Sequence, residues 1–133
     1  MKKGASVGCP ILLVGKYDEN RQTVLEAVKV VGQAFSFVPS LQDFERVLGH
    51  SGACIVLLDL QMNGVTNAMI RKIKSVRPDV IIIGISGKVF HPELEDALRT
   101  HLFAVISKLI DPEELIYCLR SALDLSHCPS AMK

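Results

Sequence analysis

Tryptophan is absent from this sequence, and aromatic residues together make up only 5% of it. Proteins that bind single-stranded nucleic acid stack the bases on aromatic side chains, so this class is disfavoured. Neither sign of charge is in excess: the formal net charge of +1 gives no electrostatic footprint for nucleic acid or for an acidic surface. We therefore expect no nucleic-acid partner for this chain.

Paired cysteines and long apolar runs are also lacking. The four cysteines (Cys9, Cys54, Cys118 and Cys128) are scattered, with no C-x-x-C pair and no clustered histidines. This pattern is typical of a reduced protein and disfavours a disulfide framework or a zinc site, so we expect a cytoplasmic location. No apolar run approaches the length that spans a bilayer, and the segment before Cys9 is too short for a signal peptide. We expect no membrane partner.

The 133 residues and the 49% hydrophobic content are ordinary for one globular domain with a substantial core. The patterned part runs from residue 10 to residue 124. Residues 1–9 are interpreted as a leader, and residues 125–133, which are polar and contain Pro129, as a tail or a linker stub. An alternative is that residues 1–124 form the N-terminal regulatory domain of a longer protein.

The central feature is the apolar run Cys54–Leu58, which ends abruptly at Asp59 and is followed by the turn signal Asn63-Gly64. A run of Ile, Val and Leu without polar alternation favours a strand buried on both faces of a parallel sheet. Asp59 then lies at the carboxyl edge, where open α/β sheets place their ligand sites. Because Asp is also a common turn former, a purely local capping role for Asp59 is the alternative.

Apolar segments of strand length alternate with amphipathic segments along the chain. The expected strands are 10–14, 34–38, 54–58, 80–85 and 103–107, and the expected helices follow caps at Asp18 or Asn20, Ser40, Thr66 and Asp111, with Pro92 in the first turn of another. This alternation predicts right-handed β-α-β units and a parallel sheet. The first, third and fourth strands are the most apolar, so they are expected to be central. We predict an α/β domain with a doubly wound, flavodoxin-like, five-stranded parallel sheet in the order 2-1-3-4-5 and helices on both faces.

Polar side chains follow three of these strands at the same predicted edge: Asp59, Ser86 and Lys108. A carboxylate, a hydroxyl and an ammonium group suit a phosphoryl site. The carboxylate can attack phosphorus, the hydroxyl can donate a hydrogen bond, and the ammonium can neutralise charge. Three unrelated strand-end residues are the alternative.

With these residues in place, the chain resembles the receiver domain of two-component response regulators (the CheY-like superfamily) over about residues 10–124. The resemblance is carried by Leu57–Met62, by Ile85-Ser86-Gly87, and by Ser107-Lys108 followed by Asp111–Leu115. It implies that Asp59 is the phosphoacceptor, that Ser86 is the hydroxyl switch residue and that Lys108 contacts the phosphoryl group. It also implies a protein-contact surface on the last two helices and the fifth strand.

The sequence departs from the family pattern at five positions. The acidic pair that holds Mg²⁺ in the family is replaced by Gly15 and Lys16, and the prolines expected after the acceptor and after the lysine are Asn63 and Leu109. The aromatic switch residue is replaced by Val105. Unit charges about 4 Å apart interact by about 4 kcal/mol at an effective dielectric near 20, so a lysine repels the metal that an acid would attract. We expect Mg²⁺ binding to be weak or lost, no other cofactor, and Lys16 beside Asp59 in place of the metal.

The favoured hypothesis is therefore a receiver-like signalling module, not an enzyme, that acts through protein contacts with weak or no phosphorylation of Asp59. An ordinary phospho-accepting response regulator is the first alternative, and a small flavodoxin-like enzyme or nucleotide binder is the second. Expected partners are proteins such as a histidine kinase or an output domain. On the last helix, Ile116 and Leu123 lie about one heptad apart and form a candidate apolar seam for a partner or a second copy.

Overall fold

The computed structural model describes residues 11–15, 20–49, 52–88 and 91–125. The elements in chain order are β1 (Ile11–Val14), α1 (Asn20–Val30), β2 (Phe35–Val38), α2 (Leu41–Leu48), β3 (Ile55–Asp59), α3 (Asn67–Val76), β4 (Ile81–Ser86), a 3-10 turn η2 (Pro92–Leu94), α4 (Glu95–Thr100), β5 (Leu102–Ser107) and α5 (Pro112–Leu125). The predicted leader, Asp18, Cys9 and Cys128 lie outside the described residues.

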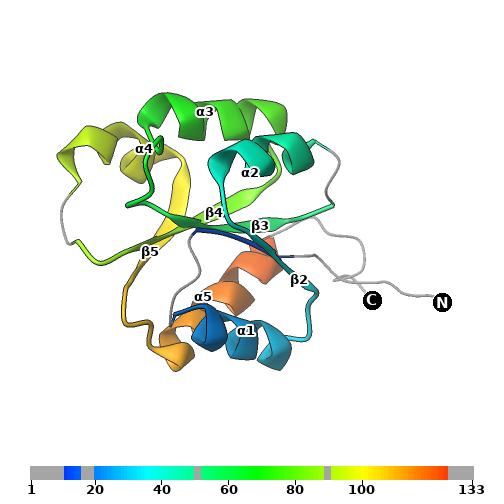
Figure 1. Cartoon of the computed structure of the whole chain (residues 1–133). Helices are drawn as coiled ribbons and strands as arrows, with labels where there is room; N and C mark the ends of the chain where they lie inside the picture. Colours follow the sequence, from blue (N-terminus) through cyan, green and yellow to red (C-terminus); the bar gives the residue numbers. More distant parts are fainter. Residues whose placement is uncertain (1–10, 16–19, 50–51, 89–90, 126–133) are drawn as a thin grey trace.

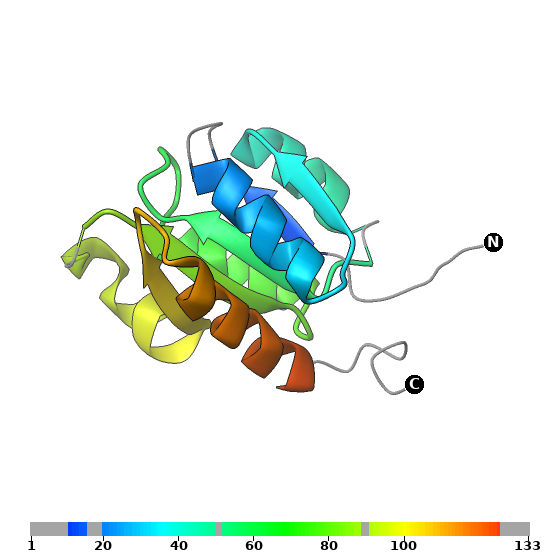
Figure 2. The same cartoon turned by 90° about the horizontal axis from the view of Figure 1, so that it is seen from below.

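All neighbouring strands pair in parallel, and the sheet order is β2-β1-β3-β4-β5. The predicted fold class, strand order and central strands are confirmed. Helices α2, α3 and α4 cover one face of the sheet, and α1 and α5 cover the other (Figure 1). Helices α1 and α5 pack side by side beneath the sheet (Figure 2).

Every residue of β3 is buried, which explains its uninterrupted run of apolar side chains. Successive side chains point to opposite faces of a strand. Leu57 accordingly belongs to the core with Val24 of α1 and Leu115 of α5, whereas Leu58 belongs to the core with Ile70 of α3 on the opposite face. Asp59, two residues after Leu57, is thereby placed on the α1–α5 face.

The predicted helix starts at Ser40, Thr66 and Asp111 are confirmed. Their side-chain oxygens accept hydrogen bonds from the backbone N–H groups two or three residues later, at 3.0–3.1 Å. The Asn63-Gly64 turn is confirmed by the φ of 96° at Gly64, a conformation that favours glycine. Asn20 is the first residue of α1, and its side-chain oxygen accepts a hydrogen bond from the backbone N–H of Ile110 at 3.2 Å.

Cys54 and Cys118 are free and buried, as expected of small core residues, and burial raises the pKa of both thiols. None of the helices in the described ranges combines the length and the apolar character that crossing a bilayer requires.

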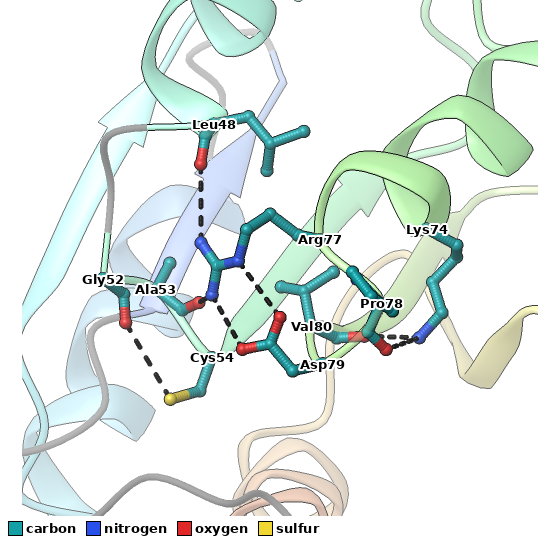
Figure 3. Close-up of polar contacts among 9 residues, drawn as sticks. All are labelled: Leu48, Gly52, Ala53, Cys54, Lys74, Arg77, Pro78, Asp79 and Val80. Carbon is teal, nitrogen blue, oxygen red and sulfur yellow. Dashed lines mark hydrogen bonds and ion pairs between the residues drawn. The ribbon is translucent and has the colours of Figure 1, made fainter.

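At the amino edge of the sheet, Arg77 joins three segments of the chain (Figure 3). Its guanidinium group donates to the carbonyl of Leu48 at the end of α2 (3.4 Å), to the carbonyl of Ala53 before β3 (2.7 Å), and to both carboxylate oxygens of Asp79 (3.1 Å each). The side chain is only 17% exposed. The planar fork of arginine suits this arrangement, and a lysine could not reproduce it.

We expect Arg77→Lys to lower the free energy of unfolding by about 2–3 kcal/mol, because two largely buried carbonyls lose a charged donor. The measurement is urea denaturation at neutral pH. Arg46→Lys is the matched control. Arg46 is 72% exposed and, in the contacts described, pairs only with Asp43 on the same helix. The free energy of unfolding should therefore change by no more than about 0.5 kcal/mol.

A pH series provides a second check. The hydrogen bond from Arg77 holds the pKa of the Asp79 carboxyl below its ordinary value. A depressed pKa contributes stability at neutral pH that is lost as the pH falls through the folded-state pKa. The stability gap between the native chain and Arg77→Lys should therefore narrow in acid, and a gap that widens in acid would contradict this assignment.

Candidate functional site

Asp59 and Lys108 meet at the carboxyl edge of the sheet. Lys108 Nζ lies 3.2 Å from Asp59 Oδ2, and the two side chains are 26% and 13% exposed, respectively. β4 separates β3 from β5, so the long lysine side chain reaches across one strand to the carboxylate. The ion pair is partly buried, and its charges are screened less than those of a surface pair.

The other oxygen of Asp59, Oδ1, accepts a hydrogen bond from the backbone N–H of Gln61 at 2.9 Å. Asp59 therefore also caps its own turn, and the local role considered from the sequence is real. The Gln61 side chain continues to the next loop, where its Oε1 accepts from the backbone N–H of Gly87 at 2.7 Å. These contacts tie the loop after β3 to the loop after β4 directly beside the carboxylate.

A cavity of about 20 Å³ adjoins Asp59. Its polar lining consists of Asn20, Arg21, Asp59 and Lys108, and aliphatic side chains form the rest with Gly15. The Arg21 guanidinium also stacks on the ring of Phe37, 4.7 Å from its centroid. A volume of this size holds about one water molecule, whereas a phosphoryl group adds a phosphorus and three oxygens to the carboxylate. The described residues that line the cavity carry two cations and one anion.

The donors in this cavity do not fit a divalent cation. Mg²⁺ in proteins is held by carboxylate and carbonyl oxygens, and Asp59 already has a cation and an N–H group as partners. Gly15 has no donor side chain, and a β-carbon there would lie 3.0 Å from Cβ of Asp59, so any side chain would require a shift of a few tenths of an ångström. Across the described ranges, no three Asp, Glu, His or Cys residues gather as metal ligands. Lys16 lies outside the described residues.

Ser86 lies at the same edge of the sheet but is turned toward different partners. In the register, Asp59 pairs with Ile85, so Ser86 is one residue further and its side chain points to the opposite face. Its hydroxyl lies 2.6 Å from His91 Nε2, and Ser86 does not line the cavity beside Asp59. Of the three predicted residues, the structure thus brings Asp59 and Lys108 together, and Ser86 lies apart from them.

Several functional contacts were missed by reasoning from the sequence. Asn20 and Arg21 reach the cavity from α1, and His91 reaches Ser86 from the start of η2. Gln61 could have been found, because a residue two positions after a strand-end Asp often supplies an N–H to it. For His91, a buried histidine directly before a proline, the sequence contains no comparable signal.

At two of the positions that depart from the family pattern, the structure shows exposed apolar side chains. Val105 is 43% exposed and Leu109 is 77% exposed. Leu109 has a φ of 39°, in the left-handed region that costs a leucine roughly 1–2 kcal/mol. This turn directs the chain so that Ile110 reaches Asn20 while Lys108 stays over Asp59.

Comparison with known structures agrees with the observed fold. The signal receiver domain of an HD domain-containing protein from Pseudomonas fluorescens superposes with a TM-score of 0.77 at 18% identity, covering 88% of this chain and 95% of that one. A CheY-like response regulator receiver domain from Methanospirillum hungatei gives 0.77 at 16% identity, covering 88% and 94%. The chain has the fold of response regulator receiver domains.

An atypical orphan response regulator, whose structure is described as revealing a phosphorylation-independent regulatory mechanism, also shares the receiver fold. Its TM-score is 0.71 at 18% identity, with 86% of this chain and 95% of that chain covered. No protein-family model matches the sequence, and no curated protein matches it either.

Within this receiver fold, we expect Lys108→Met to lower the free energy of unfolding by about 1–3 kcal/mol, because it leaves the Asp59 carboxylate partly buried without its ion-pair partner. Asp59→Asn should cost less, since Lys108 is more exposed and can turn to solvent. Denaturant titration at neutral pH measures both changes.

The control is Lys72→Met. Lys72 Nζ lies 3.9 Å from Glu45 with both side chains more than half exposed, so its loss should stay within about 0.5 kcal/mol. Equal losses for Lys108→Met and Lys72→Met would show that the Asp59–Lys108 pair has no special role.

Proposed function

We propose that this chain is a receiver-like signalling module that acts mainly through protein contacts, with Asp59 at the phosphoacceptor position but weakly or not at all phosphorylated. Lys108 is the cation of this site, and Ser86 holds the position of the hydroxyl that would contact a phosphoryl group. The module is a regulatory protein and not an enzyme, and it works in the cytoplasm with a histidine kinase, an output domain or a second copy as partner.

One observation carries this proposal: the carboxylate of Asp59 already has its charge balanced. Lys108 Nζ and the N–H of Gln61 occupy its two oxygens, and the adjoining cavity has the volume of about one water. Attack on a phosphoryl donor requires a carboxylate that is accessible and a cation that binds the incoming phosphate. Here Lys108 is already paired with the nucleophile.

The surface supports action through protein contacts. Phe103, Val105 and Tyr117 are 38%, 43% and 75% exposed, and they line a hollow of about 380 Å³ between β5 and α5. Exposed apolar groups that gather around a hollow are typical of protein-interaction sites. The shared fold with an atypical response regulator described as phosphorylation-independent is consistent with this proposal.

The decisive experiment is incubation with acetyl phosphate and Mg²⁺, followed by intact mass measurement. We expect little or no gain of a phosphoryl group, because the donor set does not fit the metal and the cavity is too small. A normally phosphorylated receiver domain, treated in parallel, controls for the reagent. A stoichiometric gain that disappears in Asp59→Asn would instead establish the ordinary phospho-accepting function.

The predicted seam on α5 is a second testable part of the proposal. Ile116 and Leu123 are partly buried against the core, whereas Tyr117 is largely exposed. If the seam binds a partner copy, Ile116→Glu should lower the mass observed by light scattering at high protein concentration. An unchanged mass for Ile116→Glu with retained thermal stability would limit Ile116 to the edge of the core.

A further inference from the structure

Ser86 and His91 form a buried side-chain hydrogen bond that the proposed signalling site does not use. The distance between Ser86 Oγ and His91 Nε2 is 2.6 Å, and the two residues are 1% and 4% exposed. The backbone N–H of Lys88 also donates to Ser86 Oγ at 2.9 Å. The hydroxyl is thus held from two sides on the face of the sheet opposite to Asp59.

The second ring nitrogen of His91 also has a polar partner. His91 Nδ1 lies 3.4 Å from Glu93 Oε2. A hydrogen bond from its own backbone N–H, with a smaller contribution from His91, holds the pKa of the Glu93 carboxyl below its ordinary value. An ionised carboxylate only accepts, so a proton on Nδ1 satisfies this contact. Nε2 then accepts from the Ser86 hydroxyl, for which the carbonyl of Lys88 at 3.2 Å is the other acceptor.

The segment that carries His91 is bound to the rest of the fold by further polar contacts. Asn67, the first residue of α3, donates to the carbonyl of Glu93 at 3.1 Å and accepts from the N–H of Ala97 at 2.9 Å. The ion pair between Arg71 and Asp96 has a distance of 3.5 Å, with both side chains half exposed. The Ser86–His91 bond is the buried member of this set, and it attaches the start of η2 to the end of β4.

We propose that His91 is a positioning residue, which holds the Ser86 hydroxyl on the α4 side of the sheet and thereby fixes η2 and α4 independently of the state of Asp59. This inference deepens the proposed function and rests on Asp59 being the group that Ser86 would otherwise serve. In this proposal, the hydrogen bond with His91 replaces the contact that an aromatic residue at position 105 would make. The Val105 side chain is exposed and makes no such contact with Ser86 among the described residues.

The first test reads the imidazole nitrogens of the ¹⁵N-labelled full chain by long-range ¹H–¹⁵N correlation. We expect Nδ1 of His91 to be protonated and Nε2 to be a hydrogen-bonded acceptor. Ser86→Ala should shift the Nε2 signal. The matched control is Ser107→Ala, because Ser107 is the strand partner of Ser86 in the register but is exposed.

The second test measures amide hydrogen exchange in residues 94–101. Ser86→Ala and His91→Phe should each speed exchange by about 3- to 10-fold, the loss expected for one hydrogen bond. His91→Gln should stay close to the native rate, because its side-chain oxygen can accept at the place of Nε2. Equal exchange in Ser86→Ala and Ser107→Ala would overturn the inference.

Treatment with acetyl phosphate and Mg²⁺ separates this inference from the proposed function. If Asp59 gains a phosphoryl group and the His91 Nε2 signal is unchanged, the proposed impairment is wrong but the positioning role of His91 stands. If the gain is accompanied by loss of the Ser86–His91 hydrogen bond, the positioning role is wrong. If no phosphoryl group is gained, the Ser86→Ala and His91 variants alone decide whether His91 positions Ser86.

Discussion

The carboxyl edge of the sheet depends on the balance between the negative charge of Asp59 at the end of β3 and the positive charge of Lys108. Asp59 closes a strand without an exposed residue, where an unpaired carboxylate would be costly. Lys108 Nζ, 3.2 Å away, removes that cost and is itself held by a strained turn at Leu109. In a metal-dependent site, several carboxylates share a dication. Here the carboxylate is paired with the ammonium group of Lys108.

The sheet was predictable because its signals are local. The apolar runs mark the buried strands, and Ser40, Thr66 and Asp111 cap helices through atoms only two or three residues away. The placement of Asp59 and Lys108 at one edge of the sheet also followed from the sheet order. Both residues leave their strands at the same edge, and a lysine side chain is long enough to cross the intervening strand.

The direction of Ser86 could not be predicted in the same way. Spacing along the sequence places Ser86 at the correct edge, but a shift of one residue in the register decides which face the hydroxyl takes. Asn20 and Ile110 are ninety positions apart, and Arg77 reaches carbonyls in two earlier segments. Such contacts follow from the packed fold, because no local pattern distinguishes these polar residues from solvated ones.

The edge strand β5 has a consequence for how this protein behaves in a concentrated solution. The strand Leu102–Ser107 contains neither a charge nor a proline, the two devices that commonly protect an open edge from pairing with another chain. Its register shifts beside Ile82 and Ile83, so the regular part is confined to Ala104–Ser107. An edge this short and interrupted can accept a brief strand from a specific partner, yet it is a poor template for the long, flat ladders from which fibrils grow.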